Sequence, residues 1–220
     1  MKTLLIAATM VLLAAGSSFA QSSRVYASAA GGFAVSPDGT SGDMLGEVGV
    51  RIAPHLYVFG DMGQFHNLQP SQLQPAVTST DTALSGDGVT VTGVARVPAW
   101  YGMGGVRWTL PVSARVSPYV FGGAGFARLT PSAQFTYTGG TLAGVATPPS
   151  TGDNVTTQLV SLGDFTQPPA STAFMFAVGG GVEAPIAPHL VADVGYRVSR
   201  VAADTPLNAQ SVTFGVGYRF

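Results

Sequence analysis

Only 10% of the residues of this 220-residue chain are charged. These few charged side chains are its first candidates for chemistry. Nine of them lie in short segments where apolar residues alternate with polar or small ones: Glu47, Arg51, Asp61, Arg107, Arg128, Glu183, Asp193, Arg197 and Arg219. Alternate residues of an extended strand share one face, so these four acids and five arginines are expected opposite the apolar residues. Carboxylates and guanidinium groups gathered on one face form paired hydrogen bonds. The pattern therefore predicts a buried ion-pair network.

The three histidines are the next candidates for chemistry, and their surroundings argue against it. His55 and His189 each follow a proline between two predicted strands, and His66 stands where a strand meets a long polar segment. A nucleophile needs a base within hydrogen-bond reach, and His66 has no serine two positions away and no evident carboxylate partner. The histidines are too scattered for metal-ligand spacing. We therefore predict no catalytic residue, no metal site, no cofactor and no enzymatic activity.

Composition narrows the class of protein. The charged fraction is well below the roughly 25% of ordinary soluble domains, and the mean hydropathy is +0.32. The absence of cysteine excludes disulfide scaffolds and thiol catalysis. A net charge of −1 leaves no basic surface for nucleic acid. An ordinary soluble or nucleic-acid-binding domain is therefore not expected.

The N-terminus has the pattern of an export signal. Lys2 supplies a positive charge, residues 4–15 are apolar, and the small residues Ser18 and Ala20 suit cleavage after Ala20. The alternative is a retained membrane anchor, although the apolar stretch is shorter than the roughly 20 residues that a membrane span needs. We predict a signal peptide at 1–20 and a mature domain at 21–220.

Period-two alternation dominates the mature chain and predicts strands. No apolar run after residue 20 approaches the roughly 18 residues of a membrane helix. In a bilayer only helices and closed barrels satisfy their backbone groups, so an exported, charge-poor chain rich in strands is expected to form a barrel. The predicted fold is all-β, an eight-stranded antiparallel up-and-down transmembrane barrel. Its strands are expected at about 24–34, 43–53, 56–65, 96–109, 116–128, 172–184, 190–200 and 211–220.

The predicted connections alternate in length, as is typical of outer-membrane barrels with short periplasmic turns and longer extracellular loops. The short ones are 53–55, 110–115 and 185–189. The long ones are 35–42, 66–95, 129–171 and 201–210. Residues 89–97 and 132–138 still alternate, so the fourth and fifth strands are expected to project beyond the membrane. The pattern at 155–165 fits either a strand extension or a short helix.

Aromatic residues on the apolar face are expected to contact lipid. Girdles of such residues form at both membrane interfaces, and the predicted members are Trp100, Trp108, Tyr196, Tyr218 and Phe220. The segment 118–128 shows little contrast because its centre is Gly-Gly-Ala-Gly. There we predict Tyr119 and Phe121 outward and Arg128 inward.

These residues resemble those of a known family, the small eight-stranded outer-membrane barrels of the opacity-protein and OmpA-transmembrane-domain kind. The likeness is most specific in the last strand, residues 212–220, which ends in Tyr218-Arg219-Phe220. The glycine-rich segment 178–183 and the strand that follows it also look like the penultimate hairpin of that family. The resemblance implies the outer membrane of a Gram-negative-type bacterium. It also implies that the assembly machinery of that membrane reads the terminal Phe220.

The expected function is that of a lipid-embedded monomer with a structural or surface-interaction role. Eight strands enclose an interior just wide enough to be filled by side chains, so the nine charges are expected to pack the lumen. An extracellular partner would then be bound by the loops 66–95 and 129–171. The alternative is a narrow porin-like channel, or a transporter for small solutes or apolar molecules. A soluble ligand-binding barrel would need a polar exterior, and the outward faces are apolar.

Overall fold

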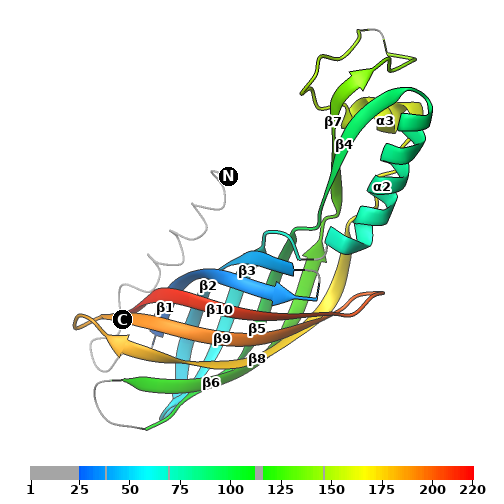
Figure 1. The fold of residues 1–220 in the computed structure, drawn as a ribbon. Helices are drawn as coiled ribbons and strands as arrows, with labels where there is room; N and C mark the ends of the chain where they lie inside the picture. The colour runs from blue at the N-terminus through cyan, green and yellow to red at the C-terminus, as the bar shows by residue number, and fades with distance from the viewer. Residues whose placement is uncertain (1–24, 38, 69, 112–115, 146) are drawn as a thin grey trace.

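The computed structural model describes residues 25–37, 39–68, 70–111, 116–145 and 147–220, which form a barrel and a projecting extension (Figure 1). The barrel consists of β1 (Val25–Ser36), β2 (Gly39–Ala53), β3 (Leu56–Phe65), β5 (Ala99–Thr109), β6 (Ser117–Leu129), β8 (Ser171–Pro185), β9 (Leu190–Ala202) and β10 (Leu207–Arg219). The extension consists of α2 (Pro70–Gly86), β4 (Val89–Arg96), β7 (Ser132–Gly140) and α3 (Thr156–Leu162). The predicted signal peptide at 1–20 lies outside the described residues.

The barrel closes in the order β1-β10-β9-β8-β6-β5-β3-β2, and neighbouring strands are antiparallel. The first and last strands complete the ring, with pairs from Tyr26↔Arg219 to Val35↔Gln210. Every other neighbour is the next barrel strand along the chain, which makes the topology up-and-down. The structure therefore confirms the predicted eight-stranded antiparallel barrel.

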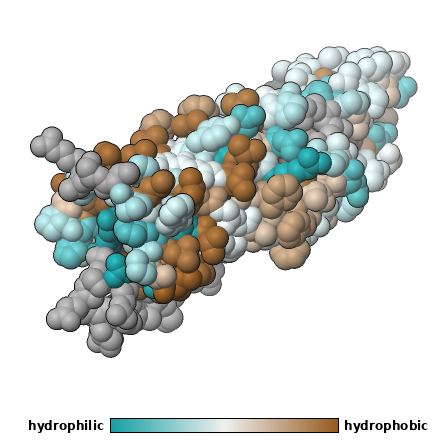
Figure 2. Space-filling view, turned by 90° about the horizontal axis from the view of Figure 1, so that it is seen from below, coloured by the Kyte–Doolittle hydropathy of each residue, from teal (hydrophilic) through white to brown (hydrophobic). Residues whose placement is uncertain are grey.

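Alternation along the strands separates an apolar exterior from a polar interior. On β2, the exposed Val48 and Val50 alternate with Glu47 and Gly49, which face inward. The same contrast recurs on β9, where Val194 and Tyr196 are exposed and Arg197 is buried. Figure 2 shows apolar residues gathered over the barrel, whereas the surface of the extension is mostly pale or teal. An exposed apolar band of this kind suits contact with lipid.

Two of the predicted long loops are hairpins instead. The predicted loop 35–42 is mostly strand, because β1 continues to Ser36 and pairs with β2 from Gly39. The predicted loop 201–210 shrinks in the same way, since β9 ends at Ala202 and β10 begins at Leu207. Burial still alternates along these strand ends, but the buried residues there, such as Ala34, Val201 and Leu207, are apolar, so the apolar-out, polar-in pattern of the sequence does not continue. The asymmetry in loop length therefore comes from the other two connections.

The extension grows directly out of two barrel strands. β4 pairs with β7 from Val89↔Gly140 to Arg96↔Ser132, beyond the point where β5 and β6 separate from the rest of the barrel. Pro98 and Pro131 lie at the junctions, where proline removes a ladder donor, yet the Thr130 N–H still donates to the Pro98 carbonyl at 3.0 Å. The chain therefore continues β5 and β6 as a two-stranded ribbon beyond the barrel, at the residues where the sequence still alternates.

Two helices cover one face of this two-stranded ribbon. α2 buries Leu73, Val77 and Leu84, which repeat at helical spacing. The segment 155–165, for which the sequence left strand and helix open, contains the short helix α3. Gly163, with φ 86°, caps the C-terminus of α3. α2 was not predicted, because Thr- and Ser-rich composition and an internal proline obscure its apolar stripe. Within the described residues, no helix is long and apolar enough to cross a membrane.

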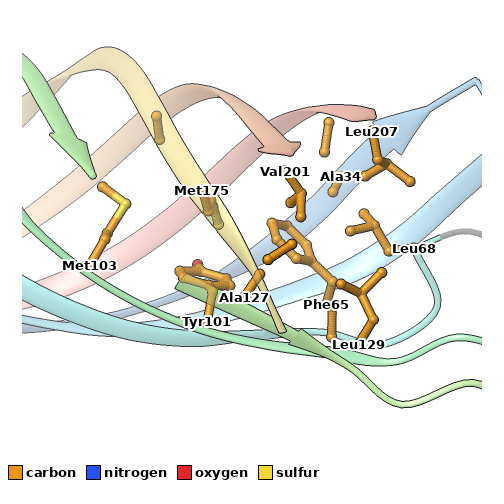
Figure 3. Packing of buried hydrophobic residues seen from close by; sticks show 14 of the residues in the cluster. Ala34, Phe65, Leu68, Tyr101, Met103, Ala127, Leu129, Met175, Val201 and Leu207 are labelled. Atoms are coloured by element: carbon orange, nitrogen blue, oxygen red, sulfur yellow. The ribbon is translucent and has the colours of Figure 1, made fainter. Parts of the chain in front are cut away.

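The molecule has two apolar cores. One fills the end of the barrel nearest the extension (Figure 3), and its largest fully buried members include Phe65, Leu68, Met175 and Val201. The same core also includes Tyr26, Phe59 and Tyr101 closer to the short turns. We call the part at the extension end the apolar plug, which consists of Ala34, Phe65, Leu68, Val97, Ala99, Leu129, Met175, Val201, Leu207 and Ala209. The other lies between the ribbon and the helices: Leu73, Val77, Leu84, Val89, Val91, Ala95, Ala133, Phe135, Tyr137, Leu142, Val155, Leu159 and Phe165. The barrel and the extension are thus packed around separate centres.

Candidate functional site

Four side chains near the short turns form an ion-pair cluster inside the barrel, which we call the turn-end cluster. Arg107 on β5 is at its centre, with Nη1 3.1 Å from Glu47 Oε1 and Nη2 2.5 Å from Glu183 Oε1. Arg219 on β10 pairs with the other oxygen of Glu183. Arg107, Glu47 and Glu183 are all at least nine-tenths buried. Two carboxylates therefore share the guanidinium of Arg107 in a water-poor interior.

Aromatic rings complete the turn-end cluster. The Tyr26 hydroxyl donates to Glu47 Oε1 at 2.5 Å, and the Tyr119 hydroxyl donates to Asp193 Oδ1 at 3.1 Å. The guanidinium carbon of Arg107 lies 3.5 Å from the centre of the Tyr119 ring, within range of a cation–π contact. Arg107 is thus held by carboxylates at its nitrogens and by a ring at its face.

A second cluster, the middle cluster, lies between the turn-end cluster and the apolar plug. Arg197 Nη2 is 2.6 Å from Asp61 Oδ2, and Arg197 Nη1 donates to the Tyr101 hydroxyl at 3.3 Å. Tyr101 in turn donates to Asp43 Oδ1 at 3.3 Å. Asp43 has no exposed surface. A chain of hydrogen bonds therefore links two carboxylates through one arginine and one tyrosine.

Strand pairing places carboxylates of the interior directly beside one another. Glu47 stands directly opposite Asp61 across β2 and β3, and Glu183 stands opposite Asp193 across β8 and β9. Like charges in such positions repel, and hydrogen bonds from arginine or tyrosine offset this. The cavity between the clusters measures about 30 Å³, and the cavity at the turn end about 10 Å³. Spaces of this size hold roughly one or two water molecules.

Seven of the nine predicted charges belong to these two clusters: Glu47, Asp61, Arg107, Glu183, Asp193, Arg197 and Arg219. Arg51 is half-buried on the same face of β2 as Glu47, nearer the short turn. Arg128 is exposed on the outer face of β6, opposite Trp100. Its predicted inward position was wrong.

Arg128 was misplaced because the inward and outward faces of the whole strand β6 are opposite to the predicted ones. Tyr119 is buried and Phe121 packs against the apolar interior, so both rings point inward and not toward lipid. Phe121 makes an edge contact with Phe59 at 5.8 Å between ring centres. The glycine-rich centre of β6 carries no side-chain contrast, whereas the Arg107 guanidinium and the Phe59 ring provide partners for aromatic rings inside.

Asp43 is the interior carboxylate that the sequence prediction missed. It has the same parity as Glu47 on β2, so alternation alone was a sufficient signal. With Asp43 included and Arg128 removed, five carboxylates and four arginines occupy the inward positions of the described strands. The acids are Asp43, Glu47, Asp61, Glu183 and Asp193, and the arginines are Arg51, Arg107, Arg197 and Arg219.

The predicted outward aromatics lie on the outer face. Trp100, Trp108, Tyr196 and Tyr218 are between 42% and 50% exposed. Phe220 is half-buried, its ring 4.8 Å from that of Tyr218, and its N–H donates to the Val25 carbonyl at 2.9 Å. The last residue is thus fixed against the first described strand.

Two of the three histidines, His55 and His189, lie in short turns and bond to the neighbouring strand through their carbonyls. A five-residue repeat occurs at 52–56 and 186–190, and in each copy the histidine carbonyl accepts a hydrogen bond from the next strand. Thr109 N–H donates to the His55 carbonyl and Arg219 N–H to the His189 carbonyl, both at 2.8 Å. His66 is exposed just after β3. Among the described residues, no group of three or more His, Asp or Glu could hold a metal ion.

A closed eight-stranded barrel with an apolar exterior and a charged interior defines an integral outer-membrane protein. The chain belongs to the family of the outer membrane protein beta-barrel domain, whose model matches residues 5–220. The barrel therefore lies in the outer membrane of a Gram-negative-type bacterium, surrounded by lipid. No curated protein matches the chain.

Solved structures share the barrel fold. Neisserial surface protein A (NspA) is 17% identical with a TM-score of 0.52, covering 89% of this chain and 96% of that chain. The attachment invasion locus protein Ail of Yersinia pestis is 15% identical with a TM-score of 0.45, covering 89% and 96%. The N-terminal β-barrel domain of OprF from Pseudomonas aeruginosa is 11% identical with a TM-score of 0.47, covering 91% and 100%. At these identities the likeness concerns the fold alone.

Proposed function

We propose that the protein is a non-conducting, non-catalytic outer-membrane barrel that displays the extension at the cell surface for contact with partners outside the cell. The observation that carries this proposal is the separate apolar core of the extension. Val77, Phe135, Val155 and Leu159 have no exposed surface there, although none of them belongs to the barrel. Connections this long are usually functional, and a packed core holds this one in a fixed shape.

The β7 edge of the ribbon is paired with a neighbouring segment, as expected for a surface-exposed sheet. Residues 152–155 run beside β7, where the Tyr137 N–H donates to the Asp153 carbonyl and the Val155 N–H to the Phe135 carbonyl, both at 2.9 Å. The Thr156 hydroxyl accepts a further bond from the Phe135 N–H at 2.8 Å. An edge closed in this way resists unwanted strand pairing and favours a defined binding surface.

The filled interior favours an anchor over a channel. The turn-end and middle clusters occupy the lumen up to the apolar plug, and the cavities lined by their charges are of the size of water molecules. A conducting path would require several buried ion pairs to open together. We therefore prefer the surface role to the alternative of a narrow pore or transporter.

Single-cysteine labelling tests the display of the extension, because the chain contains no cysteine. Thr92→Cys places a thiol on the exposed face of β4, and Ala187→Cys places one at an exposed turn at the other end of the barrel. On intact cells, a membrane-impermeant maleimide should label the first variant and reach the second only after the outer membrane is permeabilised. The reverse pattern would contradict the proposal.

We further propose that the outer-membrane assembly machinery reads the terminal strand through Phe220. The contact of Phe220 with Tyr218 and its backbone bond to β1 support this, because they place the last ring beside the closing seam of the barrel. Removal of Phe220 should lower the amount of assembled barrel in cells while refolding in detergent proceeds. Unchanged assembly in cells would contradict this part of the proposal.

A further inference from the structure

A pocket of about 200 Å³ lies where the extension meets the barrel, and no residue of the turn-end or middle cluster lines it. We call it the junction pocket. Buried apolar side chains form its floor, and exposed polar side chains form its mouth. The floor consists of Leu73, Val97 and Leu129, and the mouth consists of Ser171, Asp204 and Thr205. A molecule in this pocket therefore contacts apolar groups at one end and polar groups at the other.

The floor of the junction pocket offers hydrocarbon and no polar group. Leu129 belongs to the apolar plug (Figure 3), as does Val97, and Leu73 comes from the core of the extension. The backbone of Val97 is already bonded, because its N–H donates to Asn67 Oδ1 and its carbonyl accepts the N–H of Leu68, both at 2.9 Å. Apolar cavities of about 150 Å³ bind a molecule of the size of benzene. The floor therefore suits the hydrocarbon part of a small ligand.

The walls of the junction pocket are held in place by groups outside it. Pro131 and Pro168 line one side, and proline fixes its own φ. The Gln167 amide donates to the Pro131 carbonyl at 3.3 Å, which joins the two proline segments. Ala203 lines the pocket from the β9–β10 hairpin and packs against the core of the barrel. The pocket is thus formed by the fold itself, as is usual for small-molecule sites.

Asp204 is the single charged residue that lines the junction pocket. Its carboxylate forms no hydrogen bond or ion pair with another described residue. Three exposed arginines each precede a buried residue of the apolar plug and so point to the outer face of their strands: Arg96, Arg128 and Arg200. The exposed acids Asp87 and Asp164 of the extension do not line the pocket and supply no positive charge. The mouth is therefore negative, and a cation complements it.

We propose that the junction pocket binds a small organic amine, with its hydrocarbon part on the apolar floor and its ammonium group at Asp204. An ammonium group has three N–H donors, so the hydroxyls of Ser171 and Thr205 accept hydrogen bonds beside the carboxylate. A neutral molecule of the same shape lacks the ion pair, and an anion is repelled by Asp204. This binding activity goes beyond the proposed surface role, and it depends neither on the side of the membrane that the extension faces nor on a sealed lumen.

Titration with benzylamine tests the charge contact. The full mature chain is refolded in detergent micelles, and the NMR signals of the methyl groups of Leu73, Val97 and Leu129 are followed as benzylamine is added. These signals should shift until the pocket is saturated. Asp204→Asn should bind about 5-fold more weakly, the largest effect typical of an exposed ion pair, and benzyl alcohol should bind wild type more weakly than benzylamine. Asp87→Asn is the charge-matched control, because Asp87 follows the end of α2 that is distant from Leu73.

A second pair of variants tests the pocket itself. Ala203→Trp places a ring in the space that the ligand needs and should abolish the saturable shifts. Ala202→Trp is the matched control, because Ala202 is exposed on the outer face of β9, opposite Phe174. The heat-dependent shift of a folded barrel in gels verifies the folding of every variant. Wild-type affinity in Asp204→Asn, equal affinity for benzyl alcohol, or binding that persists in a folded Ala203→Trp variant would overturn the proposal. Cysteine labelling and conductance test the surface role separately.

Discussion

At the scale of single residues, Arg107 holds the interior together. Its two terminal nitrogens reach Glu47 and Glu183, and its face stacks on Tyr119. A buried ion pair gains little over an apolar core, but removal of one partner leaves an uncompensated charge. The turn-end cluster therefore depends on Arg107, the common partner of its two carboxylates.

Arg107→Ala should lower the free energy of unfolding by about 3–5 kcal/mol, since two buried carboxylates lose their common partner. Urea unfolding followed by the gel shift of the folded barrel measures this loss. Arg200→Ala is the matched control, because that arginine is exposed on the outer face. An equal effect of the two substitutions would contradict the central role of Arg107.

Inward glycines make room for tyrosine rings against the barrel wall. A Cβ atom on Gly49 would overlap the ring of Tyr26, and one on Gly63 would overlap that of Tyr101. A Cβ on Gly46, which faces outward on the same strand as Gly49, would approach no closer than 3.9 Å to the Ser28 carbonyl oxygen. The position of Tyr26 beside Glu47 therefore depends on glycine at 49.

Gly49→Ala should destabilise the barrel by about 1–3 kcal/mol through overpacking, whereas Gly46→Ala should stay within about 0.5 kcal/mol of wild type. Thermal unfolding of the two refolded variants compares them directly. If both substitutions cost the same, the rings are not held against the wall as described.

At the scale of elements, the sequence placed correctly the strands that alternate strongly, whereas it inverted or shortened those that do not. β9 and β10 were placed well because valine and tyrosine alternate there with arginine and glycine. β6 was inverted because its centre is Gly-Gly-Ala-Gly, and Arg128 was misplaced with it. The hairpin ends of β1 and β2 were read as a loop because Gly39, Thr40 and Ser41 show no apolar alternation, although backbone pairing and the bond from the Asn67 N–H to the Ser41 hydroxyl hold them as strand.

The helices of the extension depend on tertiary packing, so local sequence could not predict them fully. The apolar stripe of α2 is buried because it packs against β4 and against Phe135 on β7. Asp81 on α2 fixes this packing further, because its carboxylate accepts the N–H of Gly93 at 3.2 Å. Burial raises the pKa of Asp81 above its ordinary value, and the bond from Gly93 opposes that rise.

The raised pKa of Asp81 predicts a pH dependence for the packing of α2. A carboxyl whose folded pKa exceeds its unfolded value binds more protons when folded, so stability falls as pH rises between the two values. Hydrogen exchange of α2 should therefore show stronger protection on the acid side of this interval. Asp81→Asn should remove that difference, and persistence of the same pH dependence in the variant would contradict the assignment.

At the scale of the whole molecule, the interior of the barrel is polar in one part and apolar in the other. The turn-end and middle clusters occupy the part toward the short turns, and the apolar plug occupies the part toward the extension. Leu68 and Val97 join the plug to the extension, where the Leu68 N–H donates to the Val97 carbonyl and the Val97 N–H donates to Asn67 Oδ1, both at 2.9 Å. The extension is therefore connected directly to the apolar plug.

This arrangement leads to the central claim, that the barrel anchors a surface module and does not conduct ions. Planar-bilayer recording of the refolded chain tests the claim most directly, with a known porin in the same bilayer to show that channels are detected. The packed clusters and the plug predict a flat current at applied voltages of either sign. Steady single-channel conductance that requires the folded protein would contradict the sealed lumen and would favour the transport alternative.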